Sequence, residues 1–172
     1  MTDECPKIDP TAFGLFFVAL VSLPIAIACI LGFAGIENDI GLYLGDFLII
    51  GSFFIFIAAL AAYRVNANFG FIVFSLVAAG VLFAGAVGGD VYINLTLGLI
   101  YLVALIWSMR ISTPKLLTSI LLTTALIFIF GGIQVETGAD VWLLMKGIAA
   151  LANFALTLYL AYALVDDKLP VR

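Results

Sequence analysis

The chain has 172 residues, of which 65% are hydrophobic and 10% are charged, and its mean hydropathy is +1.29. Soluble domains are about 45–50% apolar and about 25% charged, so this composition places the protein in the membrane class. The sequence contains no histidine, which excludes His-based acid–base catalysis and His-ligated metal sites. Its net charge of −4 comes without a basic patch, so no nucleic-acid partner is expected.

Six apolar stretches follow one another along the chain. A helix that crosses a bilayer needs about 20 apolar residues. The stretches lie at about 11–35, 39–63, 67–88, 91–110, 113–133 and 139–165. The breaks between them are short and contain charged residues, Asn, Gly or Pro. The sequence therefore predicts an all-α, polytopic membrane protein with six transmembrane helices, in a single transmembrane domain over residues 1–172.

The basic residues in the breaks and tails all fall on one side of the predicted six-span bundle. With six spans, one side of the membrane receives the basic residues Lys7, Arg64, Arg110, Lys115, Lys168 and Arg172. The other side receives the acidic residues Glu37, Asp39, Asp90, Glu136 and Asp140. Basic loops are enriched on the cytoplasmic side of membranes. We therefore expect an integral protein of the cell (inner) membrane with both termini in the cytoplasm.

Two charged residues fall inside predicted spans. Lys146 lies six residues after Asp140, and Asp46 lies seven residues after Asp39. At a rise of about 1.5 Å per residue, both lie roughly 10 Å inward from the outer surface. An isolated charge at that depth is costly, so such residues usually face the bundle interior and pair. We predict that Asp46 and Lys146 share one polar vestibule, as a static ion pair or as a group that attracts anions or is linked to protons.

Polar neutral side chains on the last two spans form a second set of candidates. Thr123 and Thr124 lie on the fifth span, and Asn153 lies on the sixth. Such groups can line a substrate path, but they equally often bond across helices or to a backbone carbonyl. Asn153 is the strongest lining candidate of the set.

Cysteines and metal ligands are sparse. Cys5 lies in the polar N-terminal tail and Cys29 in an apolar run, so neither a disulfide nor a thiolate metal site is predicted. No cofactor and no metal are expected. The stretch 94–96, Asn-Leu-Thr, matches a glycosylation sequon, but it lies too close to the membrane for that use.

Three short motifs resemble those of the acetate uptake transporter family. The stretch 9–15, which opens the first span, is similar to the family signature Asn-Pro-x-Pro-Leu-Gly-Leu, with Pro10, Gly14 and Leu15 matching. Phe69-Gly70 and Phe74-Ser75 resemble the family stretch Asn-Thr-Phe-Gly-x-x-x-Phe-Ser/Thr. Gly147 followed by Leu158 to Ala161 is similar to the family's last helix. The motifs occur in the family's order, within the same six-span plan.

The resemblance implies a homo-hexamer with one path for acetate or succinate through each protomer, whether proton-coupled or channel-like. The family's narrow ring of Phe, Tyr and Leu corresponds here to Val18, Val77 and Thr123 or Thr124, so all three positions depart from it. Phe17 and Phe74, together with Phe16, could narrow the path from neighbouring positions.

The sequence thus predicts a transporter or channel for a small monocarboxylate such as acetate. Two alternatives remain open: a channel for small neutral solutes such as urea, ammonia or water, and a non-transporting membrane scaffold. An enzyme is not expected, because a lone Asp and Lys form no recognisable nucleophile–base arrangement.

Overall fold

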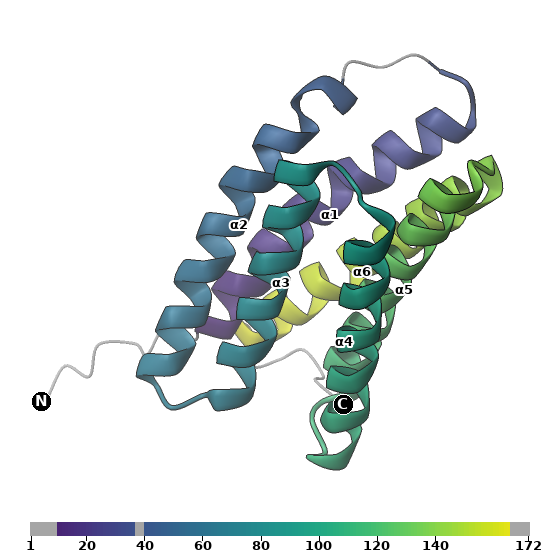
Figure 1. Cartoon of the computed structure of the whole chain (residues 1–172). Coiled ribbons are helices and arrows are strands. Elements are labelled where there is room, and N and C mark those ends of the chain that lie inside the picture. The colour runs from purple at the N-terminus through teal and green to yellow at the C-terminus, as the bar shows by residue number, and fades with distance from the viewer. Residues whose placement is uncertain (1–9, 37–39, 166–172) are drawn as a thin grey trace, which may run out of the picture.

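Six α-helices make up nearly all of the computed structural model, which describes residues 10–36 and 40–165 (Figure 1). They are α1 (Pro10–Phe33), α2 (Ile40–Arg64), α3 (Asn68–Val87), α4 (Val91–Arg110), α5 (Lys115–Thr137) and α6 (Asp140–Val165). The described part of the chain contains no strand. All six helices are long and apolar enough to cross a membrane, as expected of an integral membrane protein. The predicted all-α class with six spans is confirmed.

The largest boundary error concerns the fifth span, which was predicted to end near residue 133. The pair Gly131-Gly132 looked like the start of a break, but α5 continues to Thr137. It ends where Gly138 adopts a left-handed conformation (φ +64°) and donates its N–H to the Gln134 carbonyl at 2.8 Å. Packing against neighbouring helices lets membrane helices tolerate glycine in their interior, so glycine alone did not mark the end.

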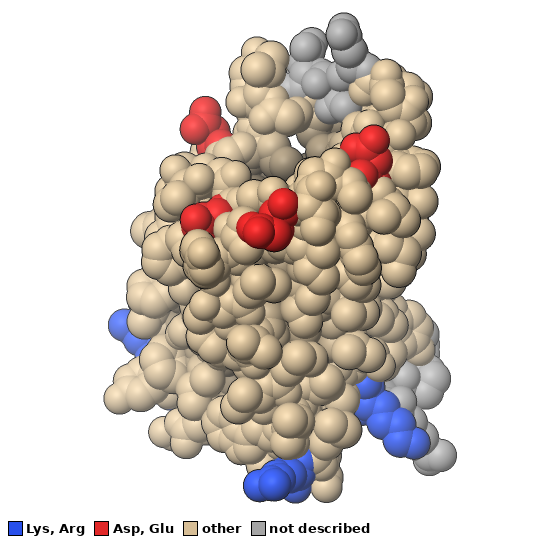
Figure 2. Space-filling view, turned by 45° about the vertical axis from the view of Figure 1, so that its right-hand side comes forward, with Lys and Arg blue, Asp and Glu red and all other residues tan. Residues whose placement is uncertain are grey.

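Successive helices run in opposite directions, so α1 begins and α6 ends at the same end of the bundle (Figure 1). We call this the basic end, because it carries Arg64, Arg110 and Lys115. The opposite, acidic end carries Asp90, Glu136 and Asp140. Figure 2 shows the two signs of charge gathered at opposite ends of the molecule, with an uncharged band between them. The predicted segregation therefore holds for the described residues.

Several residues used in the sequence predictions lie outside the described residues. They are Cys5, Lys7, Asp9, Glu37, Asp39, Lys168 and Arg172.

The helices pack in a ring that is tight on one side and sparse on the other. α1 packs against α6 and α2, α2 against α3, and α5 against both α4 and α6, whereas α3 and α4 make little direct contact. The ring of Phe128, from α5, fills part of this gap. It lies over Gly80 of α3, where a Cβ atom would come within 2.8 Å of Phe128 Cζ. It also stacks on Tyr101 of α4, with ring centroids 5.5 Å apart.

The interior is packed most closely in the half toward the basic end. Leu15, Ile55, Tyr101 and Leu121 are all at most 2% exposed there. One proline interrupts α1 near its middle: Pro24 has no N–H, so the carbonyl of Leu20 lacks its usual helical partner.

Candidate functional site

A cavity of about 320 Å³ occupies the centre of the half toward the acidic end. Its walls come from all six helices and from the α3–α4 connection, and it reaches the acidic end where Gly88 and Gly89 line it. The volume lies at the low end of the range for small-molecule sites, about 300–1,000 Å³. The full lining comprises Ile25, Cys29, Gly41, Leu44, Gly45, Leu48, Val81, Ala84, Gly85, Gly88, Gly89, Asn94, Ile127, Phe128 and Lys146.

Glycines shape one wall of this cavity. A Cβ atom on Gly85 would lie 2.6 Å from the Gly45 carbonyl oxygen, so α2 and α3 approach backbone to backbone there. Gly88 (φ +71°) and Gly89 (φ +90°) then turn the chain into α4 with backbone angles that other residues rarely adopt. Small residues thus bring α2 and α3 together and leave the space beside them unfilled.

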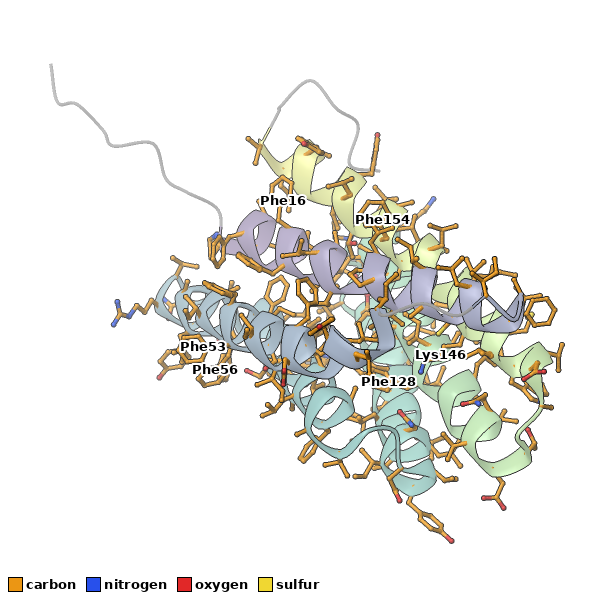
Figure 3. All side chains as sticks on the ribbon, turned by 90° about the horizontal axis from the view of Figure 1, so that it is seen from above. Phe16, Phe53, Phe56, Phe128, Lys146 and Phe154 are labelled. Atoms are coloured by element: carbon orange, nitrogen blue, oxygen red, sulfur yellow. The ribbon has the colours of Figure 1, made fainter. Side chains whose placement is uncertain are left out.

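Among the described residues, Lys146 is the only charged side chain in the cavity lining. Its stem and ammonium run past Gly131 of α5, where a Cβ atom would lie 3.5 Å from Lys146 Nζ. Figure 3 shows Lys146 pointing into the bundle beside Phe128, whereas Phe53 and Phe56 point outward from α2. Among the described residues, no carboxylate forms an ion pair with Lys146. Within residues 10–36 and 40–165, the cavity therefore holds a positive charge without an ion-pair partner.

Asn94 supplies the second polar side chain of the cavity. The Asp90 carboxylate caps α4 by accepting from the Ile93 N–H at 2.9 Å, which places Asn94 in the first helical turn. Asn94 is 7% exposed, and its side-chain amide bonds to no described residue. The sequence analysis considered Asn94 only as a glycosylation sequon, and its burial in the cavity wall rules that use out.

The end of the cavity nearer the bundle centre is apolar. Ile25, Leu48, Val81, Ile127 and Phe128 line it. Phe128 is 8% exposed and separates the cavity from Tyr101, which lies behind it and is fully buried. The cavity thus carries a charge and an amide near its mouth and hydrocarbon at its floor.

Asp46 does not share this cavity, contrary to the predicted common vestibule. It is exposed on the outer surface of α2 and makes no ion pair with any described residue. The cavity is lined by Leu44 and Leu48, each two residues away. Two residues turn a helix by about 200°, so Asp46 points away from the cavity. Equal depth did not imply a shared face.

Thr123, Thr124 and Asn153 do come together, but as a hydrogen-bonded cluster outside the cavity lining. The Asn153 amide nitrogen lies 2.9 Å from Thr123 Oγ1, 2.8 Å from Thr124 Oγ1 and 3.2 Å from the Ile120 carbonyl. Its amide oxygen accepts from the Ser22 hydroxyl at 3.0 Å. Asn153 is 1% exposed, so the cluster joins α1, α5 and α6 through bonds that are already made. Thr124 precedes Phe128 by one helical turn, so it lies nearer the basic end than the cavity floor does.

The remaining predicted path residues lie in the closely packed half of the bundle, toward the basic end. Val18, Phe74 and Val77 are 5%, 3% and 6% exposed and pack in one hydrophobic core. Phe74 fills the space over Gly14, where a Cβ atom would lie 2.6 Å from Phe74 Cε1. Phe17 stacks on Phe54, with ring centroids 4.7 Å apart. None of these four residues lines the cavity.

No family model matches this sequence, and no curated protein matches it either.

Proposed function

We propose that the protein is a membrane transporter or channel that takes up a small monocarboxylate, such as acetate, through the cavity. The observation that carries the proposal is the ammonium of Lys146, which forms no ion pair with a described residue and lies in a cavity walled by all six helices. Charges within membrane spans are costly, and they commonly mark substrate pathways. The positive-inside bias assigns the basic end to the cytoplasm, so the cavity opens to the outside.

The apolar floor supports a monocarboxylate over an inorganic anion. The methyl group of acetate would meet Leu48, Val81 and Phe128, while its carboxylate would stay near Lys146. In this structure the floor is closed by Phe128, and the interior beyond it is filled. An occupied path would therefore require Phe128 to move. Whether protons accompany the substrate, and whether six protomers assemble, are expectations from the resemblance to acetate uptake transporters.

A channel for neutral solutes is the second candidate. The cavity favours transport of some kind over a non-transporting scaffold, since a scaffold has no need of an open, charged interior. A neutral solute such as urea would gain nothing from the Lys146 charge, so the two transport hypotheses differ in how they depend on that residue.

Uptake into liposomes tests the proposal. Purified protein should move labelled acetate, and Lys146→Met should reduce the rate by about tenfold, the effect of losing roughly 1.4 kcal/mol of charge attraction. Lys115→Met is the matched control: it removes one positive charge from the basic end and should leave uptake unchanged. No acetate uptake by the folded protein, or urea flux that Lys146→Met does not alter, would overturn the monocarboxylate proposal.

A further inference from the structure

The cavity contains two hydrogen-bond donors that the protein itself leaves unused. Lys146 can donate three N–H bonds and the Asn94 amide two, and neither side chain bonds to a described residue. Asn94 is more than nine-tenths buried. Both side chains line the cavity, so a solute that enters it can accept these hydrogen bonds.

Adjacent glycines of α5 lie beside Lys146 and Asn94. A Cβ atom on Gly131 would lie 3.5 Å from Lys146 Nζ, and one on Gly132 would lie 3.4 Å from Asn94 Cβ. Consecutive residues in a helix differ in height by only about 1.5 Å. The Lys146 ammonium and the Asn94 Cβ atom therefore lie at similar heights along α5. Phe128 precedes Gly131 by three residues in α5, so it lies about 4.5 Å further from the acidic end.

The ligand chemistry follows from this layering. Two donors, one of them charged, match one carboxylate group with two acceptor oxygens. The apolar floor about one helical turn deeper matches a short alkyl group. A second carboxylate at that floor would meet Ile25, Leu48 and Val81 and would lose its hydration without a partner.

We propose that Lys146 and Asn94 form a two-donor site for a single carboxylate group, with the alkyl part of the ligand directed toward Phe128. This inference rests on the proposed function and deepens it by adding Asn94 and a binding orientation. Lys146 supplies the attraction, and Asn94 orients the carboxylate so that the hydrocarbon end enters first.

Ligand-induced stabilisation of the purified protein measures this site independently of transport. A ligand that binds only the folded state raises the melting temperature as its concentration exceeds Kd. We expect sodium acetate and propionate to raise Tm above the value in sodium chloride at equal ionic strength. Succinate at pH 7.5 should require a concentration at least about tenfold higher, and acetamide, which has no charge, should have no effect.

Substitutions at Lys146 and Asn94 measure how much each donor contributes to acetate binding. Lys146→Met should abolish the acetate-dependent shift, while Lys146→Arg should retain most of it, since the charge remains. Asn94→Leu should raise the half-saturating acetate concentration by about threefold to tenfold, the effect of one hydrogen bond to a charged group. Asn94→Asp keeps the size of the side chain, and its negative charge should abolish acetate binding by repulsion. This second variant tests the site even if Asn94→Leu fails to fold. Asn68→Leu, at the exposed start of α3, is the control and should behave as wild type.

The outcomes separate this inference from the proposed function. Acetate uptake without any shift that depends on both Lys146 and Asn94 would overturn the two-donor site and leave transport standing. A dependent shift without uptake would support the site and overturn transport. Equal stabilisation by succinate and acetate would overturn the orientation with the alkyl group at the floor.

Discussion

The two halves of this bundle are built from similar apolar residues, yet one is hollow and the other is filled. Toward the acidic end, glycines hold α2 and α3 in close contact and leave a cavity lined by six helices. Toward the basic end, Leu15, Ile55 and Leu121 are almost completely buried, and a hydrogen-bonded cluster around Asn153 joins three helices. The difference shows that residue size at particular helix faces, rather than overall hydrophobic composition, decides where the bundle is hollow.

The largest expected effect compares one leucine from each half. Leu121→Ala should lower the free energy of unfolding by about 4 kcal/mol, because the neighbours of a fully packed site cannot close the new void. Leu48→Ala should cost only about 2 kcal/mol, because Leu48 already borders empty volume. Unfolding in mixed micelles measures both. A Leu48→Ala cost equal to or above that of Leu121→Ala would contradict the contrast between the halves.

The glycine contact between α2 and α3 gives the next effect. Gly85→Leu should destabilise the protein by about 1–3 kcal/mol, because its side chain would collide with the Gly45 backbone. Gly41→Leu serves as the control, since a Cβ atom at Gly41 meets nothing within 4 Å. Thermal unfolding of the two variants in detergent provides the measurement. Equal melting temperatures would show that the close approach of the two helices does not constrain the fold.

The Asn153 cluster gives a smaller effect. Asn153→Leu should cost about 1–2 kcal/mol, because it removes bonds to Thr123, Thr124 and Ser22, and hydrogen bonds between membrane helices are individually modest. The same substitution at exposed Asn68 should be neutral. Unfolding in mixed micelles gives the free energy of unfolding of both variants. Similar losses of stability would mean that the cluster does not hold the helices of the filled half together.

The smallest effect concerns Tyr101, whose hydroxyl is buried without a partner among the described residues. Tyr101→Phe should leave the melting temperature unchanged or raise it, corresponding to a gain of up to about 1 kcal/mol, because no hydrogen bond is lost. The ring, and its stacking on Phe128, are kept. A clear loss of stability would reveal a partner for the hydroxyl.

The sequence was sufficient to predict the six helices, the segregation of charge and the position of Lys146 inside the last helix. Each of these depends on position along the chain, which helix rise converts into height. Rotation about each helix axis was not predictable, because spans that are apolar on nearly every side carry no stripe to orient them. Asp46 was therefore placed in the vestibule when it lies on the outer surface.

The same limitation explains why Asn94 and Phe128 were missed as site residues. Asn94 matters because its amide has no partner, and partners depend on tertiary packing. Phe128 looks like any other aromatic residue of an apolar span until the cavity beside it is seen. One signal was present in the sequence: a polar residue in the first turn of a span, four residues after Asp90, was available to face inward.

Pro24 gives α1 a mechanical property that the other five helices lack within the described residues. Only α1 contains an internal proline, and its missing hydrogen bond to Leu20 makes bending cheaper there than elsewhere along the helix. The next residue, Ile25, and then Cys29 line the cavity, while Val18 belongs to the filled half. Pro24 therefore marks the point of α1 where bending costs least, at the boundary between the hollow half and the filled half.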